Sequence, residues 1–143
     1  MNTVIAIDIN QQDITSALWD NDEKNINKRI KTPTPKNIDK FYDTLIDIVK
    51  KYSDDEFQGI GFSVPGTVDQ ANGIISDAKD IPYLNNFPIK DQIKNTLGLP
   101  IAMENNKKCA DLAQEVTDSM LLQDKDVYLI GAALNFYKQR EMF

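Results

Sequence analysis

The chain has 143 residues, 41% of them hydrophobic, and a formal net charge of -6 at pH 7. This length suffices for one domain with a single core, and it leaves little room for two lobes around a large substrate. The composition is that of a globular protein; no apolar run approaches the roughly 18 to 20 residues that a membrane span requires, and the negative charge, without a basic stripe, argues against nucleic-acid binding.

The sequence contains no histidine, and Cys109 is its single cysteine. These counts exclude an internal disulfide and a cysteine-rich zinc site, and they remove the commonest general base and metal ligand. We therefore predict no metal site, and any catalysis would rest on carboxylates. The N-terminal stretch MNTVIAIDI lacks the basic start and the cleavage site of a secretory signal, so we expect it to be the first strand of a cytoplasmic protein.

The first part of the chain predicts three strands and a helix. Residues 3–9 are apolar and β-branched on both faces, as in a buried strand, and DINQQD follows as a turn before a second strand at 14–19. A third strand is expected at 25–32, ended by the prolines of TPTP. From Asn37 the apolar residues recur at helical spacing, which predicts a helix whose buried face holds Phe41, Leu45, Ile48, Val49 and Tyr52.

The second part continues with alternating elements. A strand is expected at 57–64, and PGTVDQANG is interpreted as loop and turn. A short helix at 87–97 ends at Gly98, before a strand at 99–103 and a helix from about 106 to 120. This order predicts an α/β fold with a mixed sheet flanked by helices.

Residues 126–139 predict a further helix. Its Val127, Ile130, Leu134 and Tyr137 recur on one face, so we expect the helix to dock on the sheet or on the preceding helix. The alternatives are a frayed tail and a helix exchanged with a second copy of the chain, because the LLQDKD connector is short.

Four stretches carry a resemblance to a known family: IAIDI before a hairpin, GIGFSVPGTVDQANGII, IPYLNNFPIKDQIKNTLGLPIAMEN, and LIGAALNFYKQ near the end. The chain resembles the N-terminal lobe of ROK-family sugar kinases and repressors, which have an actin-like, ribonuclease-H-like fold. The last stretch is similar to the C-terminal helix that closes proteins of this family. The resemblance thus implies one domain, with a ROK-like lobe at 1–123, a closing helix at 124–143 that packs back on it, and no second lobe between them.

The family's second lobe holds the adenosine site, a second phosphate loop, a zinc site and residues that contact the sugar. Phosphoryl transfer depends on positioning and charge neutralisation between the two halves of a cleft. The resemblance therefore implies that this chain binds no cofactor and does not transfer phosphate. The sequence leaves open whether the single lobe is engineered or a natural remnant.

By the same resemblance, Asp8 matches the family aspartate that faces the metal and phosphates, which makes it the candidate cofactor-binding residue. Asn10-Gln11-Gln12 replaces the family's Gly-Gly-Thr, where glycines let backbone N–H groups approach phosphate. Asn106 stands at the position of the catalytic aspartate, and a carboxamide cannot accept a proton from the attacking hydroxyl. Structural roles are the alternative: Asp8 as a turn cap, and Asn105 or Asn106 as a helix cap.

A residual sugar site is the remaining candidate. Asn105 matches a sugar-binding asparagine, Gly66 allows a close backbone approach, and Asn85 or Asn86 is placed to contact a hydroxyl. Such residues are equally common in turns. The candidate substrate-binding set is Ser63, Gly66, Asn85, Asn105 and Asn106.

Two functional hypotheses follow. The first is a non-catalytic single-lobe derivative of a ROK sugar kinase, with a role in folding or self-association and a homodimer as its expected state, because loss of the second lobe would expose apolar surface. The second is a weakly sugar-binding or split-kinase module that needs a second lobe from another copy or a partner. On either hypothesis Cys109 is interpreted as a small buried apolar residue.

Overall fold

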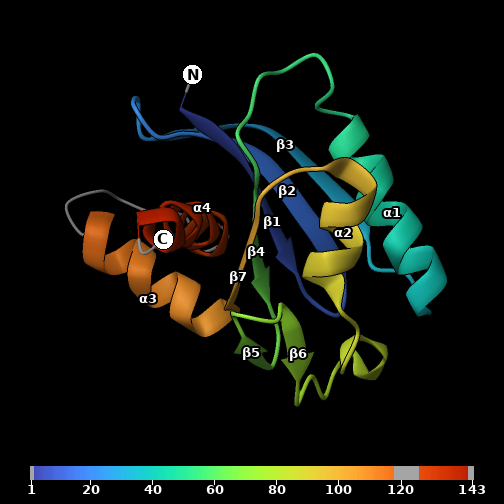
Figure 1. Ribbon diagram of the computed structural model, residues 1–143. Coiled ribbons are helices and arrows are strands. Elements are labelled where there is room, and N and C mark those ends of the chain that lie inside the picture. Colours follow the sequence, from blue (N-terminus) through green and yellow to red (C-terminus); the bar gives the residue numbers. More distant parts are fainter. Residues whose placement is uncertain (1, 118–125, 142–143) are drawn as a thin grey trace.

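The computed structural model describes residues 2–117 and 126–141 (Figure 1). The elements, in chain order, are β1 (Thr3–Ile9), β2 (Asp13–Asp20), β3 (Asn25–Pro33), α1 (Ile38–Lys50), β4 (Ile60–Val64), β5 (Thr67–Asp69), β6 (Ile74–Ser76), a short 3-10 helix (Pro82–Leu84), α2 (Ile89–Leu97), β7 (Ile101–Asn105), α3 (Asn106–Thr117) and α4 (Asp126–Glu141). None of the helices in these ranges is long and apolar enough to cross a membrane.

The main sheet has five strands in the order β3-β2-β1-β4-β7. The three N-terminal strands form an antiparallel meander, whereas β4 runs parallel to β1 and β7 runs parallel to β4. Helices α1 and α2 cover one face of the sheet, and α3 and α4 lie on the other (Figure 1). This arrangement confirms the predicted α/β fold with a mixed sheet flanked by helices.

Local sequence signals explain several element boundaries. All residues of β1 are buried, as its apolar, β-branched sequence predicts for a strand covered on both faces. The side chain of Asn37 accepts a hydrogen bond from Lys40 N at 2.9 Å and caps the start of α1. Gly98, with φ of 69°, ends α2 in the left-handed conformation that glycine adopts without strain.

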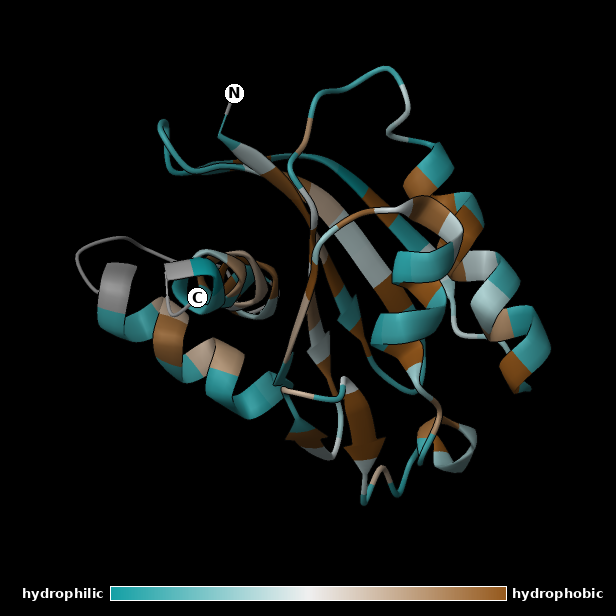
Figure 2. Cartoon of the chain, in the orientation of Figure 1, coloured by the Kyte–Doolittle hydropathy of each residue, from teal (hydrophilic) through white to brown (hydrophobic). Residues whose placement is uncertain are grey.

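The alternation of side chains along the strands builds two apolar cores. Ile5, Ile7 and Phe62 face α1 and α2 and pack in the larger core. Val4 and Ala6 face the opposite way and pack with Trp19 under α4. Figure 2 shows the apolar residues along the strands and the polar residues on the outer sides of α1 and α2.

Helix α4 lies directly on the sheet, with α3 packed along it. Gly61 and Gly131 permit this approach, because a Cβ at Gly61 would collide with the backbone of Ala132 and a Cβ at Gly131 with the backbone of Cys109. The single apolar face predicted for this helix is wrong in detail: Leu134 and Tyr137 are only half-buried. Because the sheet and α3 cover two sides of the helix, further residues are buried, namely Leu129, Ala132, Ala133 and Phe136.

Other boundaries differ from the sequence predictions. The strand expected at 57–64 begins only at Ile60, and the one expected at 99–103 occupies Ile101–Asn105. The stretch PGTVDQANG, interpreted as loop and turn, contains β5 and the turn that joins it to β6; each of these strands has three residues, too few to show a period. Helix α3 is described to Thr117, and the rest of the prediction to residue 120 lies outside the described residues.

Candidate functional site

The carboxyl ends of β1, β4 and β7 bring several candidate residues to one edge of the sheet. Asp8 is the register partner of Ser63, and Ser63 that of Glu104. Val64 is the partner of Asn105, and Asn106 then begins α3. Polar side chains at the carboxyl ends of parallel strands are typical of ligand sites in α/β proteins.

Asp8 and Ser63 form the buried part of this edge. Asp8 is 7% exposed and Ser63 is fully buried. Among the described residues, neither Asp8 Oδ1 nor Ser63 Oγ has a hydrogen-bond partner. Burial raises the pKa of the Asp8 carboxyl to about 6, and the nearby Ser63 hydroxyl opposes this rise. The site thus contains a carboxyl that titrates near neutral pH.

Cys109 lies beside this pair, at the base of α3. It is fully buried, and its thiol contacts Glu104 O with an Sγ···O distance of 3.8 Å. Burial raises the pKa of the Cys109 thiol to about 12; the nearby Ser63 hydroxyl opposes this rise, and the charges of Glu104 and Asp8 add to it. A thiol with this pKa stays protonated at neutral pH, as expected for the small buried residue predicted from the sequence.

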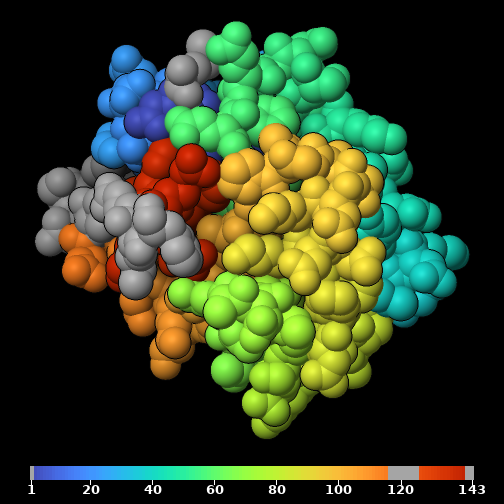
Figure 3. All heavy atoms as spheres, in the orientation of Figure 1, coloured from blue at the N-terminus to red at the C-terminus, as the bar shows by residue number. Residues whose placement is uncertain are grey.

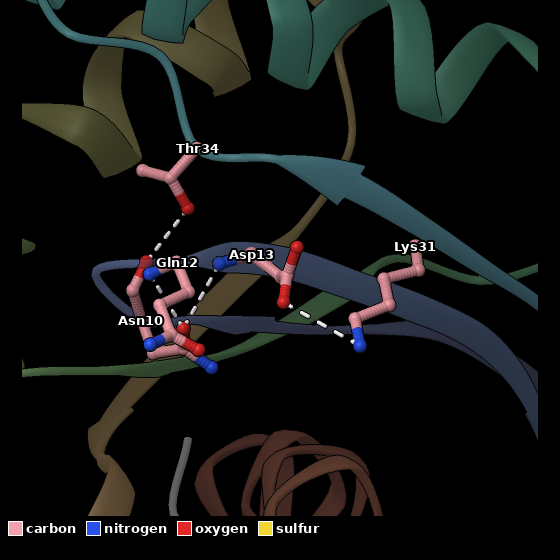
Figure 4. Close-up of polar contacts among 5 residues, drawn as sticks. All are labelled: Asn10, Gln12, Asp13, Lys31 and Thr34. Carbon is pink, nitrogen blue, oxygen red and sulfur yellow. Dashed lines mark hydrogen bonds and ion pairs between the residues drawn. The ribbon is translucent and has the colours of Figure 1, made fainter.

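The hairpin between β1 and β2 uses its own side chain to hold its backbone. Asn10 Oδ1 accepts hydrogen bonds from Gln12 N at 2.9 Å and Asp13 N at 3.0 Å, and the Thr34 hydroxyl donates to Asn10 O at 2.7 Å (Figure 4). The interpretation of Asp8 as the turn cap is therefore wrong, because Asn10, which lies within the turn, accepts hydrogen bonds from these N–H groups. Two backbone N–H groups of this loop are occupied within the chain.

A cavity of about 710 Å³ lies beside this hairpin, between β1–β3 and the start of α4, and Asp8 lines it. Arg29 forms a bidentate ion pair with Asp126, at 2.7 and 3.2 Å. Lys31 Nζ lies 3.5 Å from an oxygen of Asp13 (Figure 4). Both cations of the cavity therefore have carboxylate partners, and the sequence prediction missed them. Their signal was the spacing of two basic residues on one face of β3.

The other candidate residues make contacts within the chain. Asn105 Oδ1 accepts from Lys107 N at 2.9 Å and Lys108 N at 3.3 Å, which caps α3, and its side-chain nitrogen donates to Gly66 O. Asn85 Oδ1 accepts from Ala78 N at 2.8 Å and holds the loop after β6. The structure thus brings Asn105 and Gly66 together.

Asn106 differs from Asn105 in its surroundings. It is half-buried at the first position of α3, and its side chain forms no hydrogen bond with the described residues. Within the same residues, no group of three or more His, Cys, Asp or Glu side chains is placed to hold a metal ion. Besides Asn105, the edge therefore presents the carboxamide of Asn106, the buried carboxyl of Asp8 and the half-buried carboxyl of Glu104.

Comparison with known proteins gives the context of this site. The ROK family matches the chain over residues 4–131. A β-glucoside kinase from Listeria monocytogenes is 39% identical over 57 residues, which are 40% of this chain and 19% of that protein. A β-glucoside kinase from Klebsiella pneumoniae is 35% identical over the same shares. The chain therefore matches less than a fifth of the length of these curated relatives.

Solved structures share the fold. The ROK hexokinase from Thermus thermophilus superimposes with a TM-score of 0.70 and 25% identity, over 79% of this chain and 38% of that one. A ROK family protein from Streptococcus pneumoniae in complex with sucrose has a TM-score of 0.70 and 28% identity, over 83% and 39%. Since the family match extends over most of its residues, the chain belongs to the ROK family.

Proposed function

We propose that this chain is a non-catalytic, single-lobe member of the ROK sugar kinases that acts as a folding or self-association module. The observation that carries the proposal is Asn106, the carboxamide at the position that the family resemblance gives to the catalytic aspartate. A carboxamide hydrogen-bonds a sugar hydroxyl but cannot take its proton, and loss of a general base typically costs about 10² to 10⁴ in rate.

The hairpin after β1 supports the same proposal. Asn10 Oδ1 occupies the N–H groups of Gln12 and Asp13, which removes donors that a phosphate group would need. Among the described residues, the one carboxylate of the neighbouring cavity without an ion-pair partner is Asp8; with a pKa of about 6 it is mostly ionised at pH 7 and repels a phosphate. Neither feature favours the binding of a phosphate at neutral pH.

The test is a coupled assay of the purified chain with ATP, Mg²⁺ and either a hexose or a β-glucoside. We expect no sugar phosphate above the level of a boiled sample. Asn106→Asp should not restore activity, because it supplies the base but does not free the N–H groups that Asn10 occupies. An active sugar kinase added to the same mixture serves as the control. ATP-dependent sugar phosphate formed by the chain would overturn the proposal.

A second candidate function is residual sugar binding, alone or as half of a split kinase. It is favoured by the buried polar atoms Asp8 Oδ1 and Ser63 Oγ, which have no hydrogen-bond partner among the described residues, since unpaired buried groups gain from a ligand hydroxyl. Sedimentation with and without millimolar hexose tests it. A change in mass or shape that depends on the sugar would favour this function over the first.

Self-association would use surface that is only partly apolar. In the parts of the chain for which burial is described, every large aliphatic or aromatic side chain is at least half-buried. The half-buried ones in this region are Tyr128, Leu134 and Tyr137 of α4 and the neighbouring Ile26 of β3. We propose this surface as the interface of a twofold homodimer. The cytoplasm remains our predicted location.

A further inference from the structure

A second groove lies at the β7 edge of the sheet, away from the cavity beside Asp8. It has a volume of about 330 Å³ and runs between α2 and the end of α4, over the first residues of β7. Figure 3 looks onto this part of the surface, between the red end of α4 and the yellow to orange α2. The groove shares no residue with the cavity beside Asp8.

The charged residues of this groove are all cations. Lys90 and Lys94 reach it from α2 and Arg140 from α4, and no carboxylate lines it. Elsewhere in the described residues, the basic side chains of β3 each form an ion pair with an aspartate. Lys90, Lys94 and Arg140 form no ion pair with any described residue. In a chain with a net charge of -6, the groove is therefore a local concentration of unpaired positive charge.

The contacts that these cations do make leave their charge available. Lys90 Nζ donates to Gln70 O at 3.4 Å, which is a weak neutral contact. The guanidinium of Arg140 lies 5.5 Å from the centre of the Phe136 ring, and this cation–π contact orients it beside an apolar surface. An anion with an apolar neighbour would match both features.

The floor of the groove is the β7 edge of the sheet, where Ile101 is 6% exposed. Ile60 N donates to Pro100 O at 3.0 Å, and Ile60 is the register partner of Ile101. Because successive residues of a strand point their N–H and C=O groups to opposite sides, those of Ile101 and Met103 face away from β4. Met103 O accepts hydrogen bonds from the side chains of Asn135 and Gln139. Among the described residues, no side chain and no loop backbone group hydrogen-bonds to the N–H or C=O of Ile101.

We propose that this groove binds a short, extended acidic segment of a partner protein. The backbone of the segment pairs with the N–H and C=O of Ile101 and adds to the edge of the sheet. Its carboxylates lie near Lys90, Lys94 and Arg140, and one apolar side chain packs on Phe136. The segment is short, because α4 covers the edge at Met103.

The same charges argue against a second copy of this chain as the occupant. A symmetric pairing of two β7 edges would bring the cations of both copies together, and like charges at a sheet edge oppose pairing. A nucleic acid is also a poor match, since the unpaired groups of Ile101 suit a polypeptide backbone and the chain as a whole is negative. An acidic strand satisfies both the charge and the edge. This proposal does not depend on the loss of phosphate transfer.

The test uses fluorescence anisotropy with a labelled hexapeptide of alternating Glu and Val. We expect saturable binding that weakens with salt, and we expect the same peptide with Lys in place of Glu not to bind. The double variant Lys94→Glu, Arg140→Glu should bind roughly tenfold more weakly or worse. The control is Lys40→Glu, a change of the same type at an exposed position of α1, which should leave the affinity unchanged.

The contribution of the sheet edge is measured separately. A peptide with N-methyl groups at alternate residues cannot donate its backbone N–H groups, and it should bind more weakly than the unmodified one. In hydrogen exchange, the amide of Ile101 should become protected when the peptide is bound. The proposal is overturned if the Glu peptide fails to bind, if the control and double variants bind it equally, or if the amide of Ile101 stays unprotected in the complex.

Discussion

Asp8 and Ser63 lie opposite each other on the parallel strands β1 and β4. Both side chains are buried, and neither Asp8 Oδ1 nor Ser63 Oγ has a hydrogen-bond partner among the described residues. Burying such groups costs about 1 to 3 kcal/mol each. A structural role alone would favour apolar residues at both positions. The pair is therefore where stability and a residual binding function can be separated by experiment.

The first prediction concerns the pH dependence of stability. The pKa of Asp8 is raised from the usual 3.8 to about 6 in the folded chain, so the folded state holds its proton more tightly than the unfolded state. The tighter proton binding of Asp8 therefore adds to the free energy of unfolding; this contribution is fully present below pH 3.8 and is lost as the pH rises through about 6. Asp8→Asn should remove this loss and raise stability at pH 7 by on the order of 2 to 3 kcal/mol.

Urea unfolding of the unsubstituted chain and of the Asp8→Asn variant between about pH 3.5 and 7.5 measures the difference in their free energies of unfolding. Asp43→Asn, at an exposed position of α1, is the matched control and should follow the unsubstituted chain. Parallel curves for the Asp8 variant and the unsubstituted chain would show that the Asp8 carboxyl is not destabilised by burial.

The second prediction compares two buried serines. Ser63→Ala should cost less stability than Ser16→Ala, because Ser63 Oγ has no well-formed hydrogen bond to a described residue and only opposes the pKa rise of the nearby Asp8 carboxyl. Ser16→Ala should instead cost about 1 kcal/mol, since the Ser16 hydroxyl bonds the Tyr52 hydroxyl at 2.8 Å, which in turn donates to Lys28 O at 2.9 Å. Equal losses in thermal melts of the two variants would contradict this account of Ser63.

The third prediction tests the contact between α3 and α4. Alanine within a helix usually stabilises by about 1 kcal/mol relative to glycine. At Gly131, however, a Cβ would collide with the backbone of Cys109, so Gly131→Ala should lower the melting temperature by several degrees. Gly98→Ala is the comparison, because its position is open and only its φ of 69° opposes the change. A higher melting temperature for Gly131→Ala would mean that the helices pack less closely.

The fourth prediction concerns α4 as part of the core. A chain that ends at residue 123 should lose cooperative folding, because it uncovers Val4, Ala6 and Trp19 on the sheet face under α4, at about 1.5 to 3 kcal/mol for each large apolar side chain. Trp19 is the single tryptophan and is fully buried, so its fluorescence should shift to longer wavelength. Cooperative melting of the shortened chain within a degree or two of the full one would show that α4 is dispensable.

Much of the fold could be predicted from the sequence by itself. The bounds of β1, the start of α1 after Asn37 and the end of α2 at Gly98 follow from apolar runs and caps that act within a few residues. The resemblance to the ROK family, also visible in the sequence, indicated which residues gather at the ends of the strands. These features are local, so the neighbouring residues suffice to determine them.

The tertiary structure decided the rest. Which sides of α4 are buried depends on the sheet and on α3, and the pairing of Arg29 with Asp126 joins residues far apart in the chain. The two roles of Asn105, as cap of α3 and donor to Gly66 O, exist only because β7 places it beside the turn after β4. The place of Ile101 at the edge of the sheet likewise follows from the strand order. Such contacts depend on where the whole chain brings distant segments together, and no local pattern encodes that.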